Sequence, residues 1–441
     1  MVNKPHSASP GPGQVKEGPV TTFLRATEID ARMLGMIGAL LLIWVGFHVY
    51  GMIFNGYGAF LTFRNLWNLS VQTSSIAVMA TGMVLIIVTR HIDLSVGSML
   101  GVTAMITGVV QVWLLPPVLG FGDPAIWILA VITALVVGTL IGAFQGILIA
   151  YLQIPAFIVT LGGLMVWRGA AWWVARGETI SPVDANFALI GGGPYGSIGV
   201  TASWIVAALG CVAIAFSLHA ARRQRTRFGF PLRPMWAEVF IGTCGSLMLL
   251  GAAYVANNYP WPRGIVKQYA AAHNITVPPE GLDIGHGFAI PVLIAAAVMV
   301  GMTFLANRTR FGRYVFAIGG NPEAAELAGI NTRRVTVMVF ALMGTLVGIS
   351  AIIASARLNS ATADLGKLDE LYVIAAAVIG GTSLAGGSGT IWGAVLGALV
   401  MQSLQSGMVL IGFDSAMQQV VVGMVLVVAV WIDTIYRRRI K

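Results

Sequence analysis

The segment TGMVLIIVTRHIDLSVGSML, residues 81–100, decides the fold class. It contains the end of one long apolar run, a polar interruption with Arg90, His91 and Asp93, and the beginning of a second apolar run. An apolar run of about 20 residues is long enough to cross the hydrocarbon core of a bilayer as a helix. The segment therefore predicts two consecutive membrane-spanning helices joined by a short turn.

Runs of this kind recur along the whole chain. With 57% hydrophobic and 10% charged residues among 441, the composition excludes a soluble globular protein, in which about 25% of residues are charged. We expect an all-α polytopic membrane protein with about 10–12 transmembrane helices. The expected spans lie at 34–54, 66–89, 94–115, 125–150, 156–176, 203–219, 238–256, 288–305, 335–356, 371–383, 390–411 and 416–435. The span at 371–383 is broken by glycine and is too short to cross the bilayer as a regular helix.

The basic residues are unevenly distributed between the two sides that these spans define. Of 26 Lys and Arg residues, 19 fall on the side of the N-terminus and six on the other side, and Arg168 alone falls within a span. Short loops rich in Lys and Arg remain in the cytoplasm, so we expect both termini to be cytoplasmic. The net charge of +9 is then a signal of topology. Because no basic cluster is interleaved with aromatic residues, no nucleic acid is expected as a partner.

The domain organisation follows from composition and topology. Residues 1–33 contain many Pro, Gly and Ser residues and are expected to form a disordered cytoplasmic tail. Residues 34–436 are expected to form the transmembrane domain, which includes a cytoplasmic loop at 306–334. Residues 437–441 are expected to form a basic cytoplasmic C-terminus.

The cytoplasmic loop contains the sequence GNPEAAELAGI, residues 320–330, which predicts a short capped helix. Asn321 can accept hydrogen bonds from backbone N–H groups of the first turn, Pro322 suits the first helical position, and Gly329 can end the helix in a left-handed conformation. One face carries the small apolar residues Ala324, Leu327 and Ala328. So short a helix is marginal by itself, and this face is expected to enter a groove of another protein. An ordinary surface turn is the alternative.

The sequence contains no evident means of driving transport. A proton-coupled carrier needs ionisable groups at membrane depth, and every Asp and Glu falls in a loop or at the end of a span. Arg168 is expected to pair with a backbone carbonyl or to reach the interface, and contact with a solute is the alternative. The nearest approach to a phosphate-binding loop, Gly366 and Lys367, is followed by Leu368 where Ser or Thr would bind magnesium. Any nucleotide must therefore be bound by another subunit.

No catalytic or metal-binding cluster is evident in the sequence. Cys211 and Cys244 both fall within spans, where cysteine is usually a small apolar side chain. No spacing of His and Cys resembles a metal site. We therefore expect no metal and no enzymatic activity in this chain.

Two interruptions of the apolar pattern resemble each other. The sequences DLSVGS, at 93–98, and SLAGGS, at 383–388, share Leu, Gly and Ser in register. Paired glycine-broken segments in corresponding halves indicate a substrate pathway or gate, and two tight cytoplasmic turns are the equally weighted alternative. The candidate pathway or gate residues are Arg90, His91, Asp93, Ser95, Gly97, Thr160, Arg168, Thr382, Ser383, Gly386 and Gly387.

Other glycines are spaced four residues apart, as is typical of close helix packing in lipid. They are Gly138, Gly142 and Gly146 in the fourth span, Gly344 and Gly348 in the ninth, and Gly393 and Gly397 in the eleventh. We expect these residues to serve packing, and a dimer contact is the less favoured alternative.

Four long segments resemble a known family. TGMVLIIVTRHIDLSVGSML (81–100), IPAFIVTLGGLMVWRG (154–169), FGRYVFAIGGNPEAAELAGIN (311–331) and ELYVIAAAVIGGTSLAGGSGTIWGAVLGALV (370–400) are similar to the ribose and xylose branch of bacterial ABC sugar-importer permeases. Many members of that branch read GGIDLSVGS, whereas this chain has Arg90 and His91 at the first two of these positions. The form TRHIDLSVGS resembles the xylose-type permeases, as do the basic loop and flanking spans at about 203–256.

The resemblance implies a fold of the type II ABC importer kind, with short glycine-broken segments, in a bacterial inner membrane. It implies transport of a neutral monosaccharide, D-xylose first, by alternating access. The implied partners are a second permease copy in a homodimer, an ABC ATPase subunit with tandem nucleotide-binding domains, a periplasmic sugar-binding protein and the lipid bilayer. ATP and magnesium would bind to the ATPase, and this chain would bind no cofactor. A secondary, ion-coupled small-solute carrier is the alternative.

The resemblance also implies residue roles. The short cytoplasmic helix would couple the chain to the ATPase through Asn321, Pro322, Glu323, Ala324, Ala325, Glu326, Leu327 and Gly329. Within that set, Ala324, Ala325 and Leu327 would fill the contact. For a neutral sugar we expect a polar lining without charge, from residues such as Asn65, Gln72, Thr160, Asn359 and Gln402.

Overall fold

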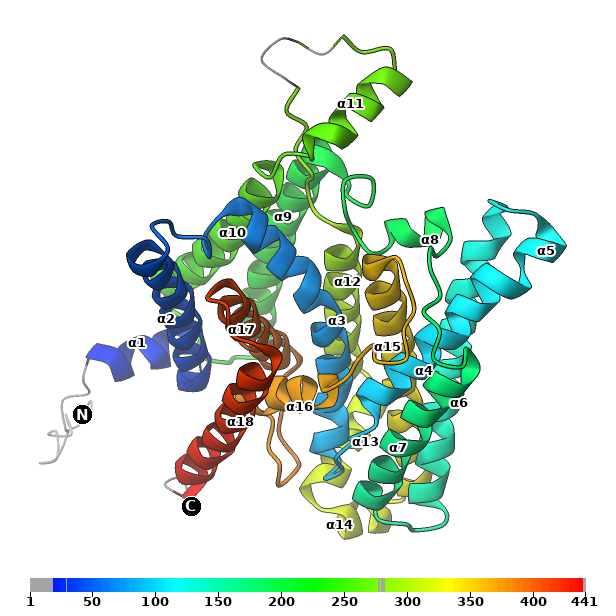
Figure 1. The fold of residues 1–441 in the computed structure, drawn as a ribbon. Coiled ribbons are helices and arrows are strands. Elements are labelled where there is room, and N and C mark those ends of the chain that lie inside the picture. Colours follow the sequence, from blue (N-terminus) through cyan, green and yellow to red (C-terminus); the bar gives the residue numbers. More distant parts are fainter. Residues whose placement is uncertain (1–18, 29, 277, 279–281, 439–441) are drawn as a thin grey trace, which may run out of the picture.

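The protein is described by a computed structural model over residues 19–28, 30–276, 278 and 282–438 (Figure 1). Among these residues, ten helices are long and apolar enough to cross a membrane, which confirms the predicted all-α polytopic class. They are α2 (Ala31–Phe54), α3 (Phe63–Val88), α4 (Val96–Val109) with its continuation through Leu119, α6 (Pro124–Ala150), α7 (Ala156–Val174), α9 (Gly199–Arg227), α10 (Met235–Asn257), α12 (Ile290–Arg308), α15 (Thr332–Leu358) and α17 (Ile391–Leu410).

Shorter helices complete the chain. They are α1 (Pro19–Thr27), α5 (Pro116–Leu119), α8 (Ala185–Leu189), α11 (Arg263–Ala272), α13 (Arg310–Gly320), α14 (Pro322–Leu327) and α16 (Asp369–Ile379), followed by the longer α18 (Ser415–Arg438). A π-helical turn, Val110–Leu114, joins α4 to α5. Helices α11 and α14 lie at opposite ends of the molecule (Figure 1). We call these ends the α11 side and the α14 side.

Polar residues begin several of the long apolar helices. The side chain of Asp30 accepts a hydrogen bond from the backbone of Arg32 at the start of α2, and Thr62 does the same for Asn65 at the start of α3. Asp123 precedes Pro124, the first residue of α6. Because the first N–H groups of a helix have no partner within it, such side chains define where each helix begins.

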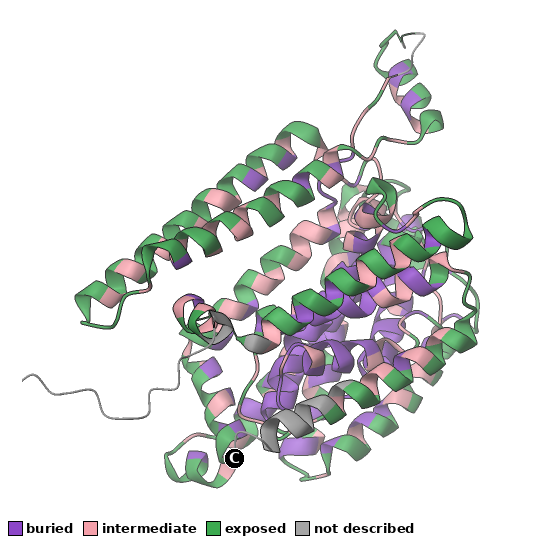
Figure 2. Cartoon of the chain, turned by 90° about the vertical axis from the view of Figure 1, so that its left-hand side faces the viewer, coloured by how far each residue is buried: buried purple, intermediate pink, exposed green. Residues whose placement is uncertain are grey.

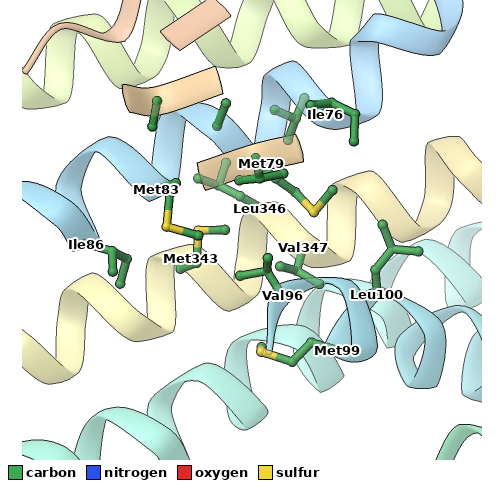
Figure 3. Packing of buried hydrophobic residues seen from close by; sticks show 14 of the residues in the cluster. Ile76, Met79, Met83, Ile86, Val96, Met99, Leu100, Met343, Leu346 and Val347 are labelled. Atoms are coloured by element: carbon green, nitrogen blue, oxygen red, sulfur yellow. The ribbon is translucent and has the colours of Figure 1, made fainter. Parts of the chain in front are cut away.

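Helices α3 and α15 form the centre of the bundle. Most of α3 is buried, and its methionines interdigitate with residues of α15, so that Met79 and Met83 lie against Met343 and Leu346 (Figure 3). Both helices are thus apolar in sequence and are covered by other helices of the chain on most of their surface. The remaining long helices surround this pair and present more of their surface (Figure 2).

The glycine spacing serves packing within the chain, as predicted. A Cβ atom added to Gly344 of α15 would lie 2.0 Å from the carbonyl oxygen of Gly138 in α6, and one added to Gly138 would lie 2.3 Å from the carbonyl oxygen of Gly344. Likewise, a Cβ on Gly393 of α17 would lie 2.0 Å from the carbonyl oxygen of Gly380. The backbones of these helix pairs therefore approach at distances that only glycine allows.

Helices α9 and α10 form a hairpin that stands beside the bundle (Figure 2). At its α14 side, the Glu28 carboxylate accepts hydrogen bonds from Arg225 at 2.6 and 2.7 Å and from Arg233 at 2.6 and 3.0 Å. Phe23 of α1 packs on Trp236 and Phe240 of α10.

These contacts correct the prediction of a disordered tail over residues 1–33. Residues 19–27 form helix α1 and residues 31–33 begin α2, because apolar and charged side chains of this segment find partners on the α9–α10 hairpin. Residues 1–18 lie outside the described residues. So do residues 439–441 of the predicted basic C-terminus, whereas 437 and 438 belong to α18.

The predicted short span at 371–383 corresponds to α16, which has only 11 residues. At 1.5 Å per residue it is about 16 Å long, roughly half the thickness of the hydrocarbon core. Segment 359–368 returns from the end of α15 into the bundle, and α16 begins there against α3, α4 and α17 (Figure 1). The cytoplasmic loop predicted at 306–334 contains both α13 and α14.

Candidate functional site

A polar cavity of about 380 Å³ lies between α3, α15, α16 and α17. It is bordered by the first turns of α3 and the last turns of α15 and α17, so it occupies the half of the bundle toward the α11 side. Its volume falls within the range of small-molecule sites. The polar side chains that line it are Asn65, Asn68, Gln72, Ser75, Arg357, Asp369, Gln402, Gln405 and Ser406.

Amide and hydroxyl groups of α3 and α17 bond to one another along the cavity wall. The Gln402 amide nitrogen donates to the amide oxygens of Gln72 at 3.1 Å and Gln405 at 3.0 Å. The Ser406 hydroxyl donates to the Asn65 amide oxygen at 3.1 Å. These side chains are thereby held in place, since each bond between them limits the rotamers available to both partners.

The prediction of a lining without charge is wrong. Arg357, near the end of α15, and Asp369, the first residue of α16, both border the cavity. Glu370, which follows, is buried. In the sequence these residues fall at the ends of apolar runs and look like loop residues. They enter the bundle because segment 359–368 folds back into it, and this fold-back has no periodic signal in the sequence.

The individual lining residues were predicted in part. Asn65, Gln72 and Gln402 border the cavity, as expected. Thr160 does not, because its hydroxyl donates to the backbone oxygens of Ile92 and Ala156. Asn359 does not either. It ends α15 in a left-handed conformation, and its side-chain oxygen accepts a hydrogen bond from the backbone N–H of Val183.

The lining residues Asn68, Gln405 and Ser406, which the sequence analysis missed, carry a detectable signal. On α3, Asn68 lies three residues after Asn65 and four before Gln72, and on α17 Gln405 and Ser406 lie three and four residues after Gln402. Residues three and four apart share one face of a helix. A polar stripe on each of two otherwise apolar helices therefore marks the wall of the cavity.

Arg168 supports the fold-back segment. Its Nη1 atom donates to the carbonyl oxygens of Ala363 and Leu365, both at 3.0 Å. The structure thus agrees with the predicted pairing of this guanidinium with backbone carbonyls. Arg168 does not border the polar cavity between α3, α15, α16 and α17, although it lines a second hollow of about 330 Å³ with Trp172.

The first glycine-broken segment packs against the fold-back segment. A Cβ on Gly97 would lie 2.2 Å from the carbonyl oxygen of Gly366 and 2.1 Å from Oε2 of Glu370. Just before it, the buried Asp93 carboxylate accepts hydrogen bonds from the backbone and hydroxyl of Ser95, at 2.8 and 2.6 Å. Gln145 of α6 donates to the Ser95 hydroxyl at 3.0 Å. Asp93, Ser95 and Gly97 therefore anchor the beginning of α4 next to α16.

The second glycine-broken segment, 380–390, follows α16 and reaches the α14 side. Thr382 and Ser383 are buried, and their hydroxyls have no partner among the described residues. Gly386 and Gly387 have positive φ angles of 85° and 76°, which favour glycine. The backbone N–H of Gly387 donates to the carbonyl oxygen of Val88 in α3 at 3.0 Å.

Arg90 joins three chain segments at this point, which we call the Arg90 junction. Its Nε atom donates to the carbonyl oxygen of Gly319 at 2.9 Å and its Nη2 atom to that of Gly320 at 2.7 Å, both at the end of α13. A Cβ on Gly386 would lie 2.4 Å from Cγ of Arg90. His91, by contrast, turns toward Phe340 and borders a surface hollow of about 490 Å³ beside α14.

Helix α14 forms as predicted. The side-chain oxygen of Asn321 accepts a hydrogen bond from the backbone of Ala324 at 3.1 Å, Pro322 is the first helical residue, and Gly329 has a φ of 81°. The Glu326 carboxylate accepts a hydrogen bond from the Thr332 hydroxyl at 2.5 Å. Both acidic residues of the helix, Glu323 and Glu326, are exposed.

The predicted contact face of α14 is exposed except at one position. Leu327 has 90% of its surface exposed, and Ala324 and Ala328 are exposed as well. Ala325 is buried within the chain, which corrects its assignment to an intermolecular contact. The exposed apolar surface of α14 is therefore formed by Ala324, Leu327 and Ala328.

The candidate pathway residues thus do not converge on one site. Asp93, Ser95, Gly97, Thr160 and Arg168 position α4 and the fold-back segment, whereas Arg90, Gly386 and Gly387 meet at the Arg90 junction. Within the described part of the chain, no group of three or more His, Cys, Asp or Glu side chains could hold a metal ion.

These features define a class of protein, a polytopic helical membrane protein with a polar cavity and an exposed helix at one end. The chain matches the family described as branched-chain amino acid transport system / permease component over residues 65–236 and 231–430. It is 35% identical to the xylose transport system permease protein XylH of Escherichia coli over 97% of this chain and 98% of that protein.

Two further relatives extend the comparison. The xylose transport system permease protein XylH of Haemophilus influenzae is 34% identical over 87% of this chain and 92% of its own length. The ribose import permease protein RbsC of Escherichia coli is 31% identical over 85% of this chain and 87% of its own length. No solved structure matches the chain. The chain therefore belongs to this permease family, within its ribose and xylose branch, and is a multi-pass membrane protein.

Proposed function

We propose that this protein is the transmembrane permease subunit of an ATP-driven importer that carries a neutral monosaccharide, with D-xylose as the first substrate to test. The full-length similarity to two xylose permeases and a ribose permease is the observation that carries the proposal. Because the lower identity belongs to the ribose permease, xylose is favoured over ribose.

The chemistry of the cavity supports a sugar as the solute. Its wall offers amide donors and acceptors, hydroxyls, one guanidinium and one carboxylate, and no aromatic ring borders it among the described residues. A cyclic polyol has several hydroxyls that can both donate and accept, so it can replace the hydrogen bonds that Gln402 and Ser406 make in its absence. Asp369 and Arg357 would give the strongest of these bonds, because charged partners strengthen hydrogen bonds.

The direction of transport follows from the proposed orientation. The α14 side would face the cytoplasm of a bacterial inner membrane, with both termini on that side, since it carries the basic loops around Arg225 and Arg310. The cavity would then receive sugar from the periplasm, delivered by a periplasmic sugar-binding protein. Alternating access of the bundle would release it to the cytoplasm.

The driving force would come from other subunits. The exposed Leu327, with Glu323 beside it on α14, would dock in a groove of an ABC ATPase with tandem nucleotide-binding domains, which would bind ATP and magnesium. Two copies of the permease would form the membrane part of the complex. Closure of the ATPase on ATP would move α14 and rock the helices of each copy.

An ion-coupled carrier was the alternative that the sequence analysis left open. The relatives named above are all permease components of transport systems, and they argue against it. Asp369 and Glu370 are nevertheless acidic residues within the bundle, where a carrier would need them. The test therefore has to separate ATP from an ion gradient.

Reconstitution provides this test. The full-length permease is placed in proteoliposomes with its ATPase and sugar-binding protein, and uptake of labelled xylose, ribose and glucose is measured with ATP or with an imposed proton or sodium gradient. We expect the complete complex to take up sugar with ATP in the absence of an ion gradient. We expect no uptake when the ATPase is omitted. Accumulation of sugar by the permease alone under an ion gradient would contradict the proposal.

A further inference from the structure

We infer that Arg90 is a positioning residue that transmits the movement of α14 to the loop 380–390 and through it to α16. The inference rests on the proposed function, an importer whose ATPase binds α14. Arg90 lies outside the cavity and outside α14, so neither sugar contact nor ATPase contact explains the side chain at this position.

The backbone at Arg90 favours glycine. Arg90 has a φ of 64°, its N–H donates to the carbonyl oxygen of Ile87 at 2.9 Å, and the N–H of His91 donates to that of Ile86 at 3.0 Å. This pair of bonds ends α3 in a Schellman motif, in which the left-handed position is usually occupied by glycine. Any side chain there is unfavourable for the backbone. Contacts made by the arginine side chain must therefore offset that cost.

The guanidinium binds the end of α13. Its two hydrogen bonds, from Nε and Nη2, reach the carbonyl oxygens of the last two residues of α13, Gly319 and Gly320. A cation is favourable at the C-terminus of a helix because the carbonyl groups there carry partial negative charge. The next residue, Asn321, caps α14. A displacement of α14 therefore acts on the two carbonyl groups that Arg90 holds.

The aliphatic part of the same side chain contacts the loop 380–390. The carbonyl oxygen of Val88 accepts the backbone hydrogen bond of Gly387, and Cβ atoms added to Gly386 or Gly319 would lie within 3.0 Å of neighbouring backbone or of Arg90. The end of α3, the end of α13 and the loop thus approach so closely that no Cβ atom fits at Gly386 or Gly319. We therefore expect a shift of one segment to displace the other two.

The loop 380–390 leads directly to the cavity. It follows α16, whose 11 residues form one rigid element, and the first residue of α16, Asp369, borders the cavity. Packed contacts and a rigid helix are the physical means by which a local movement reaches a distant site. The Arg90 junction accordingly connects α14, the proposed ATPase-binding helix, to the cavity wall. No residue of the junction itself borders the cavity.

The experiment measures sugar transported per ATP hydrolysed in proteoliposomes that contain the permease, its ATPase and its sugar-binding protein. The variant is Arg90→Gly, which removes the side chain and relieves the left-handed backbone. Arg313→Ala is the matched control, because Arg313 is an exposed arginine of α13. Among the described residues, its side chain makes no hydrogen bond to the end of α3 or to the loop 380–390. Thermal unfolding of each purified permease is recorded alongside.

For Arg90→Gly we expect an unfolding temperature close to that of the parent, because relief of the left-handed backbone compensates for the two lost hydrogen bonds. We also expect ATP hydrolysis within about twofold and a transport ratio at least about fivefold lower, as for a typical coupling free energy. Arg313→Ala is expected to keep the parent ratio. If Arg90→Gly does not assemble, Arg90→Gln is judged by the same ratio.

A ratio within about twofold of the parent, or an equal loss in Arg313→Ala, would overturn the role of Arg90. The proposed function fails differently, through a parent complex that takes up no sugar with ATP. The two failures are therefore distinguishable in one set of measurements.

Discussion

Arg168 and Leu365 are joined by a hydrogen bond of 3.0 Å from the guanidinium of α7 to a backbone carbonyl of the fold-back segment. A second bond of equal length reaches Ala363. The segment lacks regular structure and lies inside the bundle, where its carbonyl groups need donors. A charge that is unfavourable in a membrane helix is thus used to hold the segment that places Asp369 at the cavity.

Replacement of Arg168 by Met is expected to displace the fold-back segment. Two charge-assisted hydrogen bonds are lost, each worth roughly 1.5–3 kcal/mol, so the unfolding temperature falls and ATP-dependent uptake is reduced at least tenfold. Arg168→Lys keeps the charge but has a different donor geometry, so it should retain part of the stability and part of the ATP-dependent uptake. Thermal unfolding and uptake check the pair, and normal uptake by Arg168→Met would contradict the structural role.

Substitutions in the cavity should weaken transfer of the sugar without loss of assembly. Gln402→Leu removes the donor that reaches Gln72 and Gln405, and Asp369→Asn removes the carboxylate. A lost hydrogen bond of about 1 kcal/mol lowers uptake at a fixed concentration of loaded binding protein about fivefold. Ser217→Ala, on the exposed hairpin, is the control and should transport normally.

Two apolar residues of α14, Leu327 and Ala325, should respond to substitution in different ways. Leu327→Asp changes an exposed residue, so the permease should keep its unfolding temperature but lose co-purification of the ATPase and ATP-dependent uptake. Ala325→Leu overfills a buried position and should lower the stability of the permease itself by about 1–3 kcal/mol. A pull-down with the ATPase and thermal unfolding separate the two effects. Retention of the ATPase by Leu327→Asp would argue against docking at α14.

The contact of α6 with α15 should tolerate no side chain. Gly344→Val places atoms where the backbone oxygen of Gly138 lies, and a cost of about 1–3 kcal/mol or failure to fold is expected. Gly301→Ala in α12 is the matched control, since a Cβ there meets nothing within 4 Å. Yield and thermal unfolding in detergent distinguish the two variants, and equal stability would contradict the close approach of the helices.

The ion pairs of Glu28 at the base of the α9–α10 hairpin predict over which pH range this contact keeps its full stability. Hydrogen bonds from Arg225 and Arg233 lower the pKa of Glu28 from 4.5 to about 2. A lowered carboxyl pKa contributes stability that is complete above the ordinary value and is lost as the pH falls through the lowered one. Hydrogen exchange in residues 222–234, corrected for the intrinsic rate, should therefore be unchanged between pH 7 and about pH 5.

The variant Glu28→Gln tests the same contact at a single pH. It should accelerate exchange in residues 222–234 at pH 7, because neither arginine then has a carboxylate partner there. Glu323→Gln, on the exposed face of α14, provides a control for the removal of one acidic group from the same side. Equal exchange in the parent and Glu28→Gln would show that the ion pairs do not hold the hairpin.

Much of the fold was predictable because lipid imposes a simple rule on sequence. Each long apolar run became a helix near its expected bounds, and the capping residues Asn321 and Pro322 predicted α14 to within a residue. These predictions succeed because they depend on local chemistry, the transfer of apolar side chains out of water and the partners of the first N–H groups.

The site was less predictable because it depends on segments distant in sequence. Arg357 and Asp369 read as loop residues, and only the return of segment 359–368 into the bundle brings them to the amides of α3 and α17. Thr160 and Asn359 have the right chemistry, but their polar groups are occupied by backbone partners. The sequence does not show which polar side chains already have hydrogen-bond partners within the fold and are therefore not available to a solute.

The sequence by itself determined that the chain crosses a membrane many times, which side carries the basic loops, and that a capped helix projects from that side. Hydropathy, charge and capping are properties of neighbouring residues, so they can be read without a fold. Only the tertiary structure decided that Arg168 supports the fold-back segment, that a charged pair borders the cavity, and that Arg90 joins α3, α13 and the loop after α16. Those relationships join residues far apart in the chain, and the packing of helices in three dimensions alone brings them together.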